Sequence, residues 1–140
     1  MIADHRAAGK PVSVMMMDLD KFKQINDSFG HDVGDRVLKS VADVLRATLR
    51  HNDAIARIGG DEFAAALPNV DRIGAMEIAE RIMQVASEQY VRADANATVP
   101  LKLSIGICDN TKLSSAEEML KSADKAMYLA KGKADAPDAG

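Results

Sequence analysis

With 140 residues the chain can form one domain with a sizeable core, and 47% apolar with 28% charged residues is typical of a soluble globular protein. Its net charge of −3 does not provide the basic surface that non-specific nucleic-acid binding needs, so we expect no nucleic-acid partner. The single cysteine, Cys108, excludes an intramolecular disulfide. The longest apolar run, Val12–Met17, is too short to span a bilayer. We therefore expect a cytoplasmic location.

The first third of the chain predicts a buried strand between helices. Residues 1–8 are typical of the end of a helix that stops at Gly9. Val12–Leu19 is apolar on both faces, as a central strand covered on both sides would be. Residues 21–29 then predict a short helix closed by Gly30.

A longer helix and a hairpin are predicted next. Apolar residues recur every three or four positions over residues 32–50, which indicates an amphipathic helix. Residues 54–58 and 62–67 are typical of strands, and the paired glycines between them are a hairpin signal. Such glycines are expected to supply the positive φ angles of a tight hairpin turn.

The second half predicts a helix over residues 73–86, one strand over residues 99–107, and a last helix that ends near Lys131. Ser114 or Ser115 is expected to cap that last helix. Helices that interrupt a sheet with a local hairpin predict an α+β fold, a two-layer sandwich whose mainly antiparallel central sheet is flanked by helices.

Acidic residues at two separate places are candidates for a metal site. Asp18 and Asp20 end the buried strand, where a carboxylate is costly unless it is paired or binds a cation. Alone, this pair also fits a strand-to-helix loop in which Asp20 caps the next helix, and Asp61 and Glu62 also fit an exposed hairpin tip. If the hairpin lies beside the first strand, however, the acids converge, and oxygen-rich clusters of this kind suit Mg²⁺.

These residues belong to blocks that resemble the GGDEF family of diguanylate cyclases. Residues 59–63 read GGDEF, and residues 18–38 read DLDKFKQINDSFGHDVGDRVL, which is similar to the family's upstream block. The resemblance extends from about Val12 to Lys131. Further matches in the expected order are Arg57, AERI at 79–82, SIG at 104–106 and ADKAMYLAK at 123–131. The resemblance implies a core like that of nucleotide cyclases and polymerase palms, with a ferredoxin-like arrangement.

The resemblance implies a catalytic centre at the end of the first strand. Asp18, Glu62 and the backbone carbonyl of Leu19 would hold Mg²⁺ or Mn²⁺ against the phosphates of GTP. Asp61 would lie close to a second metal position, and Gly60 would leave room for the substrate over the hairpin.

The resemblance also implies residues that bind the nucleotide. Asn26 and Asp35 would hydrogen-bond the guanine edge, and Leu38 would line the base pocket. The terminal phosphates would lie at a helix N-terminus, which is a natural anion site. The residues assigned there are Lys21, Phe22, Lys23 and Lys131.

A third set of residues resembles the family's product-inhibition site. Arg50 and Asp53 form an RxxD motif five residues before GGDEF, where the arginine would bind cyclic di-GMP. Arg81 is a candidate second contact. The motif also fits a cation at a helix C-terminus with a nearby surface salt bridge.

The function that the resemblance implies is condensation of two GTP into cyclic di-GMP and pyrophosphate across a homodimer. The alternative is a module that senses GTP or cyclic di-GMP within a larger signalling protein. Residues 1–134 are expected to form one domain and residues 135–140 a flexible tail. The family's opening segment is missing, so we expect further regulatory domains in a longer parent, and Asp135 stands where the family has a phosphate-binding arginine unless a deletion aligns Lys133 there.

Overall fold

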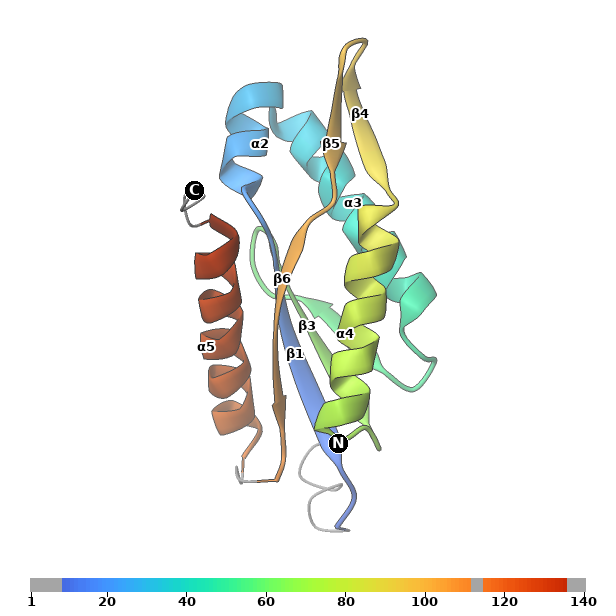
Figure 1. The fold of residues 1–140 in the computed structure, drawn as a ribbon, viewed down its shortest axis with the longest axis vertical. Helices are drawn as coiled ribbons and strands as arrows, with labels where there is room; N and C mark the ends of the chain where they lie inside the picture. The colour runs from blue at the N-terminus through green and yellow to red at the C-terminus, as the bar shows by residue number, and fades with distance from the viewer. Residues whose placement is uncertain (1–8, 112–114, 136–140) are drawn as a thin grey trace.

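The computed structural model describes residues 9–111 and 115–135, and an antiparallel sheet lies between helices in it (Figure 1). The sheet has the order β2-β3-β1-β6, and each neighbouring pair is antiparallel. Its strands are β1 (Val12–Leu19), β2 (Ala54–Arg57), β3 (Glu62–Pro68) and β6 (Leu103–Asp109). The helices are α2 (Phe22–Phe29), α3 (His31–Thr48), α4 (Arg72–Ser87) and α5 (Ala116–Asp135). Two more strands, β4 (Tyr90–Asp94) and β5 (Ala97–Pro100), form a separate hairpin.

Strand β1 is the centre of the fold, and all eight of its residues are buried. Alternate side chains enter two different apolar clusters because a strand turns successive residues to opposite faces. Met15, Met17 and Leu19 join the larger cluster with residues of α3 and α4. Val12, Val14 and Met16 join a smaller cluster whose other members are Cys108, Met119, Ala123 and Met127.

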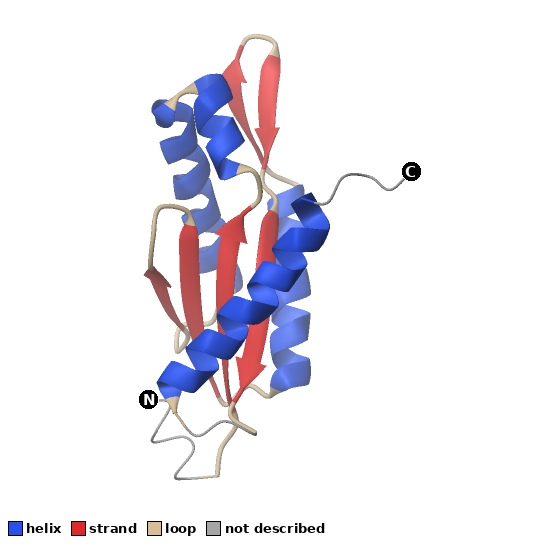
Figure 2. Ribbon diagram, turned by 90° about the vertical axis from the view of Figure 1, so that its left-hand side faces the viewer, coloured by secondary structure: helices blue, strands red, loops and turns tan. Residues whose placement is uncertain are grey.

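The expected α+β class, with an antiparallel sheet flanked by helices, is confirmed. The helices cover both faces: α5 lies on one, and α3 and α4 lie on the other (Figure 2). The sheet is therefore the middle of three layers, which corrects the expectation of two. The physical reason is the apolar run of β1, because a strand that is apolar on both faces must be covered on both.

Side chains cap two of the helices. Ser115 is confirmed as the cap of α5: its Oγ accepts from the Glu118 amide at 3.1 Å and donates to Glu118 Oε1 at 3.1 Å. Asp71, which the sequence did not single out, caps α4 by accepting from the Gly74 amide at 2.8 Å. The predictions for residues 1–8 and Ser114 lie outside the described residues.

The single strand predicted over residues 99–107 is wrong. Val99 belongs to β5, which pairs with β4, whereas residues from Leu103 onward pair with β1. The apolar alternation runs through both because the chain stays extended as it passes from one sheet to the other. Strand β4 escaped prediction because only Val91 in it is buried, so it has no alternating pattern.

The predicted hairpin is confirmed as β2–β3, but the role given to its glycines is wrong. Neither Gly59 nor Gly60 has a positive φ. Residues 58–61 form a wider connection, in which the Ile58 amide donates to the Glu62 carbonyl at 2.9 Å. A connection of this length turns the chain without the two left-handed residues that a two-residue hairpin turn needs.

A different glycine, Gly106 in β6, lets α5 approach the sheet closely. A Cβ at this position would overlap the Ala123 carbonyl oxygen and the Met127 amide nitrogen of α5. Both clashes are with backbone, which a side-chain rotation cannot relieve. Gly106 therefore sets the distance between α5 and the sheet.

We predict that Gly106→Ala destabilises the fold by at least the roughly 1–3 kcal/mol of ordinary core overpacking, because α5 must move away from β6. Gly132→Ala is the matched control. Gly132 lies in α5, nothing lies within 4 Å of its added Cβ, and alanine is the better helix former by about 1 kcal/mol. Urea unfolding measures both, and equal stability of Gly106→Ala and the unmodified chain would contradict the close packing.

Candidate functional site

The ladder between β1 and β3 brings the predicted acids together. Asp18 lies directly opposite Glu62 in the antiparallel register. The next residue, Leu19, donates its amide to the Asp61 carbonyl at 3.3 Å. The expected convergence of Asp18, Asp61 and Glu62 at one end of the sheet is therefore confirmed.

Asp18 is a buried carboxyl with an unusual electrostatic environment. The residue is 5% exposed. Burial, and then the neighbouring Asp61 carboxyl, raise the pKa of Asp18 to about 7, and Lys131 opposes this shift. Oδ2 accepts from Lys131, but Oδ1 is buried without a hydrogen-bond partner. An unpaired buried oxygen is costly, and a ligand that used it would recover that cost.

Lys131 reaches this carboxyl from the far end of α5. Its Nζ lies 2.8 Å from Asp18 Oδ2 and 3.2 Å from the Leu19 carbonyl oxygen. Lys131 is one helical turn beyond Met127, the residue that packs on Gly106. The close approach of α5 to β6 thus places the ammonium group at the end of β1.

The donors at this place fit a hard divalent cation. The Asp18 and Glu62 carboxylates and the Leu19 carbonyl are the oxygen ligands that Mg²⁺ and Mn²⁺ prefer, and Asp18 Oδ1 has no other partner. Within residues 9–111 and 115–135, no three His, Cys, Asp or Glu side chains gather into a complete metal site. That fits Mg²⁺, which commonly combines one or two carboxylates with water and substrate phosphates.

Arg57 holds the turn that carries the acids. Its Nε donates to the Gly59 carbonyl at 3.1 Å, and one terminal nitrogen donates to the Gly60 carbonyl at 2.7 Å. The space where a Cβ of Gly60 would lie is open to at least 4 Å. Sequence analysis matched Arg57 to a family motif but assigned it no role. The structure shows that its side chain holds the turn through the two carbonyl groups.

The residues predicted to bind guanine lie around the start of α3. Asp35 and Leu38 line a cavity of about 610 Å³ whose other wall includes Arg57 and Phe63 of the hairpin. Asn26 does not line this cavity. Its Oδ1 is buried without a partner, where a Cβ of Gly34 would overlap it. The structure therefore brings Asn26 next to the residue before Asp35 and leaves its amide turned into the α2–α3 contact.

The turn between β1 and α2 is tied to β6 by Asp20. The Asp20 amide donates to the Lys102 carbonyl at 2.9 Å, and its carboxylate accepts from Ser104 Oγ at 2.5 Å. The hypothesis that Asp20 caps the next helix is therefore wrong, because Lys21 holds the cap position and has no side-chain capping bond. Lys21 adopts φ 60°, a left-handed conformation that costs a residue with a Cβ roughly 1–2 kcal/mol.

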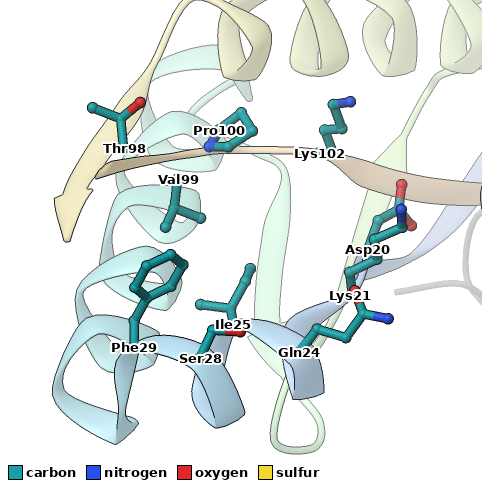
Figure 3. A pocket seen from close by; sticks show the side chains of 10 residues that line it. All are labelled: Asp20, Lys21, Gln24, Ile25, Ser28, Phe29, Thr98, Val99, Pro100 and Lys102. Atoms are coloured by element: carbon teal, nitrogen blue, oxygen red, sulfur yellow. The ribbon is translucent and has the colours of Figure 1, made fainter. Parts of the chain in front are cut away.

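After this turn the first residues of α2 follow. Lys21 and Lys23 are exposed and Phe22 is half-buried. The first amides of a helix have no acceptor within the helix, so they are available to an anion. A separate cavity of about 530 Å³ lies between α2 and β5, where Ile25 and Phe29 face Val99 (Figure 3).

The RxxD motif is a compact ion pair. Arg50 donates to both carboxylate oxygens of Asp53, at 2.7 and 3.2 Å, and to the Pro68 carbonyl at 2.8 Å. The hydrogen bonds to Asp53, and the charge of that carboxylate, raise the pKa of Arg50 above its ordinary value. The Asp53 side chain is 0% exposed and that of Arg50 is 49% exposed. Arg50 and Arg81 line one cavity of about 400 Å³, so the structure brings these two predicted residues together.

The comparisons with known proteins agree with this arrangement. The family described as "Diguanylate cyclase, GGDEF domain" matches residues 1–136. The chain belongs to the GGDEF family. The chain is 40% identical over 121 residues to diguanylate cyclase A of Treponema denticola. The aligned region covers 86% of this chain and 32% of that protein.

Solved GGDEF domains have the same fold. The GGDEF domain of YfiN from Pseudomonas aeruginosa matches with a TM-score of 0.88 and 36% identity over 94% of this chain and 83% of that one. The GGDEF domain of DgcB from Caulobacter crescentus, solved with cyclic di-GMP, matches with a TM-score of 0.87 and 28% identity over 94% and 76% of the two chains. The chain spans about a third or less of the length of the curated relatives, between 28% and 32%.

None of the helices that the structure describes is long and apolar enough to cross a membrane.

The bond between Ser104 and Asp20 can be tested by stability. We predict that Ser104→Ala costs roughly 1.5–3 kcal/mol, as expected for a hydrogen bond to a charged group. Ser13→Ala is the matched control, because Ser13 is also a buried β-sheet serine but donates to a neutral carbonyl, that of Val70, at 2.8 Å. The control should cost only about 0.5–1.5 kcal/mol. Equal losses of unfolding free energy in urea for the two variants would show that the bond to Asp20 is no stronger than the bond to a neutral carbonyl.

Proposed function

We propose that this domain condenses two molecules of GTP into cyclic di-GMP and pyrophosphate. The observation that carries the proposal is the buried Asp18, aligned with Glu62 and left with an unpartnered Oδ1. The relatives named diguanylate cyclases support the reaction, and the DgcB domain solved with cyclic di-GMP supports the product.

In this proposal the chain's own residues position the reacting phosphates. Asp18, Glu62 and the Leu19 carbonyl would hold Mg²⁺ or Mn²⁺, and Asp61 would add negative charge beside them. Such an ion, when bound, stabilises charge on the α-phosphate and pyrophosphate and lowers the pKa of the attacking 3′-hydroxyl. Gly60 carries no side chain and the space beside its Cα is open, which would leave room for the sugar and phosphates.

Binding of the terminal phosphates would involve the amides at the start of α2 together with Lys23 and Lys131. Guanine would occupy the cavity lined by Asp35 and Leu38. An aspartate can accept from both the N1–H and the amino group of guanine, which adenine cannot reproduce. Asn26 would have to rotate out of the α2–α3 contact to reach a base in this cavity, and the guanine amino group would then donate to its unpartnered Oδ1.

One domain binds one GTP in this scheme, whereas the product joins two. A two-fold dimer that turns two such sites toward each other is therefore required, and each chain contributes half of the active site. Further domains in a longer parent would control how often the two halves meet. Product inhibition would act at the Arg50–Arg81 cavity, whose arginines suit the phosphates of cyclic di-GMP.

A direct assay tests the reaction. Incubation with GTP and Mg²⁺ should yield cyclic di-GMP at a rate that rises faster than linearly with protein concentration. Changing a residue that only hydrogen-bonds a metal ligand typically lowers activity roughly 10–100-fold. Glu62 is a proposed ligand itself, so Glu62→Gln should lower the rate by more than that. Glu117→Gln, an exposed residue on α5, is the control and should leave the rate unchanged. GTP binding without any product, even in an enforced dimer, would favour the sensing role instead.

The inhibitory site is tested separately. Arg50→Ala should weaken inhibition by added cyclic di-GMP about 10–100-fold, the equivalent of one charged hydrogen bond. Because this change also strands the buried Asp53, Arg81→Ala serves as a second variant that keeps the Arg50–Asp53 pair. Arg92→Ala, on the exposed side of β4, is the control. Unchanged inhibition in both Arg50→Ala and Arg81→Ala would show that the RxxD motif is only a structural ion pair.

A further inference from the structure

Lys131 contacts two of the three groups that the proposed function assigns to the divalent cation, the Asp18 carboxylate and the Leu19 carbonyl. Its ammonium lies 2.8 Å from Asp18 Oδ2 and 3.2 Å from the Leu19 carbonyl oxygen. We propose that Lys131 is an exchangeable internal cation, which neutralises Asp18 and leaves these oxygens when a divalent cation binds. The inference rests on the proposed metal site and concerns how that site is controlled.

The ionised form of Asp18 needs a positive charge at this place whether or not a metal ion is bound. Asp18 is 5% exposed, and Asp61 next to it adds to the negative charge. A buried carboxylate without a counter-charge is strongly unfavourable. The Lys131 ammonium meets that requirement from α5, although Lys131 lies 112 residues from Leu19 in the sequence.

The lysine and a divalent cation compete for the Leu19 carbonyl oxygen and for the charge of the Asp18 carboxylate, even when the cation binds Oδ1 and the lysine binds Oδ2. Mg²⁺ binds its oxygen ligands at about 2.0–2.1 Å, closer than the ammonium, and the two positive charges would repel each other across a small buried space. The lysine is the movable partner. Its four-carbon stem is flexible, and its side chain is 21% exposed, so a rotation carries the charge toward solvent while the backbone of α5 stays packed.

The exchange links metal binding to nucleotide binding. A displaced ammonium remains within a side-chain's length of the site, because Gly106 holds α5 against β6 one turn before Lys131. The triphosphate of GTP offers it new anionic partners, which Asp18 then no longer has to provide. We therefore expect the divalent cation to bind weakly to the protein alone and strongly in the presence of nucleotide. The phosphates of the nucleotide would replace Asp18 as the anionic partner of the Lys131 ammonium.

The test measures Mn²⁺ binding, not turnover. Free Mn²⁺ is followed by electron paramagnetic resonance during titration of the chain without nucleotide. Lys131→Met, which removes the competing charge, should bind Mn²⁺ more tightly by about tenfold, within the range by which neighbours of a metal ligand alter its affinity. Lys121→Met is the matched control on the same helix, because that lysine is 77% exposed and pairs with Glu117 at the surface. It should bind as the unmodified chain does.

Thermal unfolding in EDTA adds a second readout. Lys131→Met should unfold at a lower temperature than the unmodified chain, because Asp18 loses its counter-charge, and Mn²⁺ should raise its unfolding temperature by the larger amount. Lys131→Gln, which keeps a donor for Asp18, covers the case in which the methionine variant does not fold. Equal or weaker Mn²⁺ affinity in both Lys131 variants would overturn the exchange while leaving the metal site intact. Absence of Mn²⁺ binding in every protein, with and without a GTP analogue, would overturn the site itself.

Discussion

In the ladder between β1 and β3, Asp18 lies opposite Glu62, and this alignment constrains everything around it. Successive side chains of a strand point to opposite faces, so a shift of one residue would turn Asp18 to the other face and separate it from the acids of the turn. The register is itself held by the core. Met15, Met17 and Leu19 enter one apolar cluster while Val12, Val14 and Met16 enter the other, and a slip would exchange the two sets.

The same alignment creates a charge that the fold must neutralise. Asp18 closes a strand that is buried throughout, and its carboxyl is raised in pKa by burial and by Asp61. The counter-charge comes from Lys131, which reaches the site only because α5 packs closely on Gly106. The packing of α5 on the sheet therefore also determines the electrostatics of the site. The glycine that permits helix–sheet contact also decides where a cation lies relative to the acids.

Sequence patterns predicted most elements because their periods are local properties. The apolar run of residues 12–19, the helical repeat of residues 32–50 and the Ser115 cap each follow from neighbouring residues, and each is confirmed. Predictions that needed a partner strand were less successful. The pattern over residues 99–107 could not show that Val99 pairs with β4 and Leu103 with β1, because alternation records which face is buried and not against which strand.

For the site, the sequence by itself determined the chemical types and their order: two acids after a buried strand, two more after paired glycines, and an RxxD motif between them. Only the tertiary structure decided their partners. It placed Lys131 on Asp18, Ser104 on Asp20 and Arg57 on the glycine carbonyls of the turn. The physical reason is that spacing along the chain specifies faces and turns, whereas charge pairing depends on distances that exist only once the helices have packed on the sheet.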